Sequence, residues 1–144
     1  MLNMNMIGRN EKMPKNNGAR FRGLPVQSSA SNENTVTLLG WSRSSLTSSV
    51  ERANARYKLT LKKNYDNNVS QLIRRSDSWP FLQHGVPAIW FHTGLHPDYH
   101  LVTDQADRIN YPKMERIARL VHQTSWDLAA SAARPTLNTR AVQP

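Results

Sequence analysis

The pattern of apolar and polar positions predicts three short strands along the chain. Residues 2–7 alternate apolar side chains with asparagine, which is typical of a half-buried strand. A second short apolar run covers residues 36–39. The most apolar run, residues 86–91, is bounded by Gly85 and Gly94 and is rich in β-branched and aromatic residues. Because this run is short, it favours a buried strand over a helix.

Helical periodicity predicts two longer helices and one short helix. In residues 44–58, Leu46, Val50 and Ala53 fall on one helix face. Residues 112–130 form the strongest helical pattern, with a continuous apolar face and Asn110 as the expected cap. Residues 76–82 predict a short capped helix, and residues 10–31, 62–70 and 92–107 predict loops.

This order of elements predicts an α/β fold, in which part of a mixed, mostly parallel sheet is flanked by helices. We expect one domain over residues 1–132 and a flexible tail over residues 133–144. If the first and third strands are parallel in one sheet, residues 5–8 and 92–100 follow them at the same edge. Ligands of open α/β sheets bind at that edge, so these two segments are the expected site.

Composition and charge exclude several classes of protein. The chain has no cysteine, which excludes a disulfide scaffold, a Cys-ligated zinc finger and a thiol nucleophile. No apolar run is long enough for a membrane span, and no signal peptide is visible. The net charge is +9, but the basic residues are scattered and carry no nucleic-acid motif. We therefore expect no specific nucleic-acid partner, and nonspecific binding to polyanions stays as an alternative.

A loop rich in histidine is the strongest candidate for chemistry. Three histidines and one aspartate lie within nine residues after the third strand: His92, His96, Asp98 and His100. This composition suggests a metal site. However, Gly94 and Pro97 disfavour a helix here, so the four-residue spacing of the histidines does not place them on one face. The alternative is that most of these histidines are surface residues of a loop.

Several short motifs, taken in order, resemble a known family. Residues 3–9 read Asn-Met-Asn-Met-Ile-Gly-Arg, residues 76–81 read Ser-Asp-Ser-Trp-Pro-Phe, and residues 85–88 read Gly-Val-Pro-Ala. Asp-Tyr-His then occurs at residues 98–100, followed by Asp104. This combination resembles the carboxyl-terminal half of the zinc aminopeptidases of metallopeptidase family twenty-eight, over residues 2–130. The resemblance implies a truncated zinc-exopeptidase-like fold.

The resemblance also implies roles for individual residues. His100 matches the last zinc ligand of the family, and Tyr99 matches a residue thought to steady the oxyanion of the transition state. Asn5 stands where the family has an aspartate that ligates the other of two zinc ions. A neutral amide is a much poorer zinc ligand than a carboxylate, so Asn5 marks a degraded ligand position. Ser78 replaces a usual histidine, and Leu-Val at residues 101–102 replaces a usual Thr-Pro.

The family's remaining metal ligands and general base precede the segment that residues 2–7 resemble. We therefore expect a fragment of a zinc-dependent exopeptidase of the aminopeptidase type, whose intact relatives hydrolyse peptides with two zinc ions. We expect the chain alone to be inactive, because one imidazole does not hold a catalytic zinc. The alternative is a non-catalytic, peptidase-like interaction module that self-associates or binds a partner through an exposed sheet edge. An extracellular or periplasmic location is expected for an intact relative.

Overall fold

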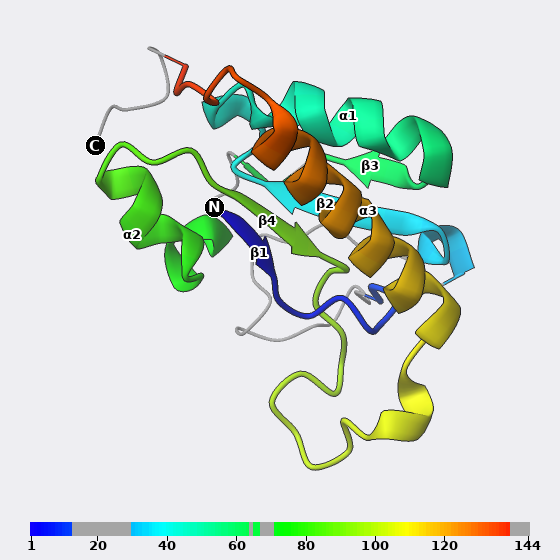
Figure 1. Ribbon diagram of the computed structural model, residues 1–144. Helices are drawn as coiled ribbons and strands as arrows, with labels where there is room; N and C mark the ends of the chain where they lie inside the picture. The colour runs from blue at the N-terminus through cyan, green and yellow to red at the C-terminus, as the bar shows by residue number, and fades with distance from the viewer. Residues whose placement is uncertain (13–29, 64, 67–70, 139–144) are drawn as a thin grey trace.

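A four-stranded sheet forms the centre of the molecule (Figure 1). The computed structural model describes residues 1–12, 30–63, 65–66 and 71–138. The strands are β1 (Leu2–Met4), β2 (Thr35–Leu39), β3 (Thr60–Lys62) and β4 (Ile89–His92), in the order β1-β4-β2-β3. β1 is parallel to β4 and β2 is parallel to β3, whereas β2 and β4 are antiparallel. The prediction of a mixed, mostly parallel sheet in an α/β fold is confirmed.

Helices cover both faces of this sheet. α1 (Leu46–Tyr57) and α3 (Tyr111–Ala130) lie side by side on one face, as Figure 1 shows. α2 (Ser78–Gln83) packs with the short 3-10 helix η4 (Leu72–Arg75) against the other face. Three further 3-10 helices are η2 (Ala30–Asn32), η3 (Trp41–Arg43) and η5 (Ala106–Arg108). The three helices that the periodicity predicts are therefore all present.

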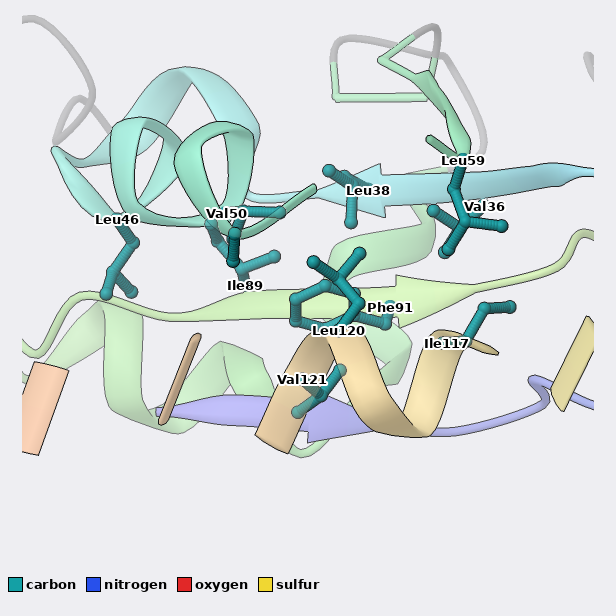
Figure 2. Packing of buried hydrophobic residues seen from close by; sticks show 11 residues of the cluster. Val36, Leu38, Leu46, Val50, Leu59, Ile89, Phe91, Ile117, Leu120 and Val121 are labelled. Carbon is teal, nitrogen blue, oxygen red and sulfur yellow. The ribbon is translucent and has the colours of Figure 1, made fainter. Parts of the chain in front are cut away.

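The alternation of side chains along β4 divides the core into two clusters. Ile89 and Phe91 are fully buried against α1 and α3. Figure 2 shows apolar side chains of both helices gathered around Phe91. Ala88 and Trp90 point to the opposite cluster, together with residues of η4 and α2. Successive strand residues face opposite sides, so a single apolar run buries both faces of the sheet.

The start of α3 connects two loops to the sheet. The Asn110 side chain accepts a hydrogen bond from the Lys113 backbone N–H at 3.1 Å, which confirms the predicted cap. Lys113 itself is buried, and its Nζ donates to the Asn32 carbonyl at 2.6 Å and to Asn10 Oδ1 at 3.2 Å. Burial lowers the pKa of Lys113 to about 8. This one side chain therefore ties η2 and the segment after β1 to the helix.

The strand boundaries differ from the prediction for local reasons. β1 ends at Met4, and Met6 has a left-handed backbone with φ of 61°. β4 begins at Ile89, after Pro87, which has no N–H to donate to a neighbouring strand. β3 was missed, because three residues at a sheet edge show too short a pattern to predict a strand.

Residues 136–138 return to the end of η3 and the start of α1. Ser45 N donates to the Thr136 carbonyl at 2.9 Å, and Asn138 N donates to the Arg43 carbonyl at 2.9 Å. The predicted domain boundary at residue 132 and the flexibility of residues 133–144 stay predictions; residues 139–144 lie outside the described part. The predicted loop at residues 10–31 also lies mostly outside it. Within the described ranges, no helix is both long and apolar enough to cross a membrane.

Candidate functional site

The carboxyl ends of β1 and β4 lie side by side because the two strands are parallel. Backbone hydrogen bonds continue the pairing past the strands: Asn5 N donates to the Phe91 carbonyl at 3.4 Å, and Thr93 N donates to the Met6 carbonyl at 3.0 Å. The Thr93 hydroxyl donates to the same Met6 carbonyl at 2.7 Å. The prediction that residues 5–8 and 92–100 share one edge of the sheet is confirmed.

A cavity of about 300 Å³ opens at this edge. Its wall is formed by residues that follow β1, by η4, by β4 and by the loop after β4: Asn5, Met6, Leu72, Arg75, Trp90, His92, Leu95, Tyr99, His100 and Asp104. The structure thus brings together the three residues singled out from the sequence, Asn5, Tyr99 and His100. Their roles as ligand positions and as a transition-state donor stay predictions.

His100 and Tyr99, in the loop after β4, form a stacked pair. Their ring centroids are 3.8 Å apart and their planes differ by 24°. His100 is exposed and has a backbone φ of 59°. A non-glycine residue in the left-handed region is uncommon and marks a position that its surroundings hold in place. The geometry presents the His100 imidazole to solvent beside the half-buried Tyr99 ring.

An ion-pair cluster attaches this loop to the segment after β1. Arg9 binds Asp98 at 2.7 Å and also pairs with Asp104, and Arg108 binds the other oxygen of Asp98 at 2.8 Å. The Thr103 hydroxyl donates to Asp98 at 2.8 Å. The hydrogen bonds from Arg9 and Thr103 hold the pKa of Asp98 well below its usual range. Asp98 is therefore an ionised partner of both Arg9 and Arg108.

The other two histidines of the loop are buried. His92 Nδ1 accepts a hydrogen bond from the Gly94 N–H at 2.7 Å, so the proton of the neutral ring is on Nε2. Burial lowers the pKa of His92 to about 3, and it also lowers the pKa of His96. His96 Nε2 lies 3.8 Å from an Asp104 oxygen. His96 lines a neighbouring polar cavity of about 390 Å³ rather than the one that contains His100.

The donor set does not fit a resident pair of metal ions. Within the described residues, no three His, Cys, Asp or Glu side chains are grouped so as to hold a metal. Around the first cavity, Asn5 is a neutral amide and Asp104 is paired with Arg9. His92 uses its Nδ1 lone pair on Gly94. Of the described residues that line this cavity, His100 is thus the one that offers a solvent-exposed imidazole.

The residues flagged as departures from the family pattern take separate places. Ser78 is fully buried and its hydroxyl accepts a hydrogen bond from Asn3 Nδ2 at 3.3 Å, so it joins α2 to β1. Leu101 and Val102 are 49% and 94% exposed, so this part of the loop packs little apolar surface. The loop is held by its ion pairs.

Two residues of the site were missed from the sequence. Arg75 lines the first cavity, and its place directly before the Ser-Asp motif is the signal that could have found it. Arg9 anchors the loop, and it ends the motif at residues 3–9. The sequence assigns neither arginine a role, because the spacing of motifs does not show which arginine pairs with a carboxylate about ninety residues away in the chain.

Comparison with known proteins gives one match. A family model described as Peptidase family M28 matches residues 1–125. No curated protein and no solved structure matches the chain significantly.

Proposed function

The chain belongs to peptidase family M28, and on this premise we propose that it supplies part of a zinc-dependent exopeptidase domain of the aminopeptidase type. The supporting observation is the cavity at the carboxyl edge of the sheet. Asn5 reaches it from the end of β1, and Tyr99 and His100 reach it from the loop after β4. Segments more than ninety residues apart thus meet where ligands of α/β folds bind.

The proposal gives each of these residues a chemical role. The Tyr99 hydroxyl donates a hydrogen bond to the carbonyl oxygen of a bound peptide as negative charge develops there. His100 contributes an imidazole ligand to zinc only together with ligands from outside the described residues. Asn5 is a degraded ligand position, because its amide carries no charge to balance a cation.

We further propose that the chain by itself hydrolyses no peptide bond. Hydrolysis needs an activated water molecule and a positioned general base. At the cavity, the Asp104 carboxylate is paired with Arg9. Burial keeps the His92 ring neutral, and its Nδ1 lone pair accepts a hydrogen bond from the Gly94 N–H. Neither of these two groups is available as a base, and the proposal assigns His100 to zinc rather than to proton transfer.

Zinc uptake and hydrolysis by the purified chain test this proposal. We expect no chelator-sensitive turnover of aminoacyl p-nitroanilides in the presence of zinc. Asn5→Asp restores a carboxylate to the cavity and should raise zinc uptake at least about tenfold. Asn34→Asp, at an exposed position away from the cavity, is the charge-matched control. Chelator-sensitive turnover by the unmodified chain would show that it is a complete enzyme.

A non-catalytic interaction module is the alternative, and the free edge of β1 favours it. In the described sheet β1 pairs only with β4, and Met4 on this edge strand is 49% exposed. Unpaired strand edges associate with other chains. Light scattering after size exclusion should then show an oligomer that Met4→Lys disrupts and Trp126→Lys, at an exposed position on α3, leaves intact. A monomer at all concentrations would count against this alternative.

A further inference from the structure

An arginine side chain lines the cavity that contains Tyr99 and His100. Arg75, the last residue of η4, lines it with an exposed guanidinium. Within the described residues this guanidinium has no hydrogen-bond or ion-pair partner. Its neighbour Arg74 behaves differently, because its guanidinium lies over the Trp79 ring at 4.9 Å from the centroid. Of this pair of arginines, one is engaged and the other is available to a ligand.

Two neutral donors lie in the same wall. His92 is fully buried, and its Nδ1 accepts from Gly94, so its Nε2 carries a proton that has no partner among the described residues. A buried donor without a partner is destabilising, so an acceptor that reaches it from the cavity is favoured. The exposed Asn5 side chain adds an amide, and its NH₂ group has no partner in the described part of the chain.

The negative charge in the wall is already neutralised. Among the described residues, Asp104 is the one carboxylate that lines the cavity, and it pairs with Arg9. The Arg75 charge is therefore not balanced inside the cavity. The remaining wall includes apolar side chains from four segments: Met6, Leu72, Trp90 and Leu95. The cavity thus combines a free cation and unpaired donors with an apolar lining.

We infer that this cavity binds a carboxylate that carries an apolar side chain, with Arg75 as the residue that recognises the charge. The planar guanidinium matches a carboxylate through two parallel hydrogen bonds. A volume of about 300 Å³ accommodates one amino-acid residue with its acyl group. The ligand class is that of an amino acid or the carboxyl end of a short peptide.

This inference deepens the proposed function, because it names the ligand class of the same cavity, but it requires no zinc. The binding experiment therefore uses the full chain in the presence of a chelator. N-acetyl-L-leucine is the probe, and N-acetyl-L-leucinamide is its uncharged isostere. We expect saturable binding of the acid, seen as changes in the NMR signals of the Asn5 and Arg75 side chains. The amide should bind at least about tenfold more weakly.

Variants of the two neighbouring arginines identify the recognition residue. Arg75→Gln should weaken binding of the acid at least about tenfold, whereas Arg74→Gln should change it less than about twofold. Inorganic phosphate serves as the competing anion and should bind more weakly than the acid. Equal binding of acid and amide, tighter binding of phosphate, full affinity in Arg75→Gln, or no saturable binding of the acid would each overturn the inference. Failure of zinc uptake by Asn5→Asp would instead count against the proposed function alone.

Discussion

The apolar face of the sheet and the segment beyond the carboxyl end of β4 show how differently one chain stabilises its core and its site. On the face covered by α1 and α3, side chains such as Val36, Phe91 and Ile117 are completely buried in one apolar cluster. At and beyond the carboxyl end of β4, the chain contains buried histidines, paired charges and exposed loop residues. Hydrophobic burial is nondirectional and independent of pH, whereas the ion pairs depend on geometry, salt and protonation.

This difference means that the site and the core respond to different perturbations. A change in the apolar face alters the free energy of unfolding of the whole domain. A change at the carboxyl edge alters the loop that carries Tyr99 and His100, while the helices and the sheet remain packed. Four perturbations test this separation, and they follow from the largest expected effect to the smallest.

Phe91→Ala should cause the largest loss of stability. Phe91 is fully buried between the sheet and the two long helices, so its truncation removes apolar contacts and leaves a cavity. The expected decrease in the free energy of unfolding is about 3–5 kcal/mol, measured by urea denaturation followed by circular dichroism. Trp126→Ala is the control, because Trp126 is 67% exposed on α3 and its loss should change stability by less than about 1 kcal/mol. Equal effects of the two substitutions would contradict the assigned core.

Gly94→Ala should destabilise the start of the site loop by roughly 2–4 kcal/mol. Gly94 has a φ of 87°, and a Cβ placed there would lie 2.2 Å from Glu11 Cβ. Gly85→Ala separates the two causes, because Gly85 has a φ of 75° but nothing within 4 Å of the added Cβ. Backbone strain alone should make Gly85→Ala destabilising by about 1 kcal/mol. If both variants have the same melting temperature, the close packing of Glu11 on Gly94 is wrong.

Acidification should destabilise the fold through His92. Burial lowers its pKa to about 3, whereas in the unfolded chain it titrates near its usual value of 6.5. Between these values the unfolded state binds the extra proton, so stability falls as the pH is lowered. From about pH 7 to about pH 5 the expected loss is about 2 kcal/mol, to which His96 adds in the same direction.

Urea denaturation at several pH values measures this slope. His92→Phe should remove most of it, whatever that variant's stability at neutral pH. Trp126→Ala should leave the slope unchanged, because Trp126 has no titratable group and is exposed on α3. A slope that survives in His92→Phe would mean that another group carries the pH dependence.

Arg9→Gln should loosen the site loop with the smallest effect on the core. The side chains of Arg9 and Asp98 are only 16% and 14% exposed. The substitution removes the cation that Asp98 and Asp104 share, and Asp98 keeps only Arg108. Amide exchange in residues 98–104 should quicken about tenfold, while exchange in α3 stays unchanged. Arg119→Gln breaks a fully exposed helical pair with Glu115 and should change neither region. Unchanged exchange in the Arg9 variant would show that the loop is held by other contacts.

The same contrast explains how much could be predicted from the sequence. The apolar run that contains Ile89 and Phe91 and the periodic pattern of α3 gave the sheet, the helices and the α/β class, because burial imposes a regular period on side chains. β3 was missed, since a three-residue edge strand has no such period. The left-handed φ of Met6 ended β1 earlier than its alternating pattern indicated.

At the site, the sequence predicted which segments lie together but not which side chains form ion pairs. The order of the strands predicted that Asn5 and His100 would meet at one sheet edge, and the two residues do line one cavity. No pattern in the sequence showed that Arg9 would pair with Asp98 and Asp104. Nor did any pattern show that Arg75 would line the cavity with no partner among the residues that the structure describes. It also left open which of the three loop histidines would be buried.

The sequence by itself determined the alternation of strands and helices, the apolar faces and the family to which the chain belongs. These properties are local or periodic, so the order of residue types carries them. Only the tertiary structure decided which charges are neutralised, which histidines are desolvated and which donors remain free. Those properties depend on distances between residues far apart in the chain, and folding alone determines such distances.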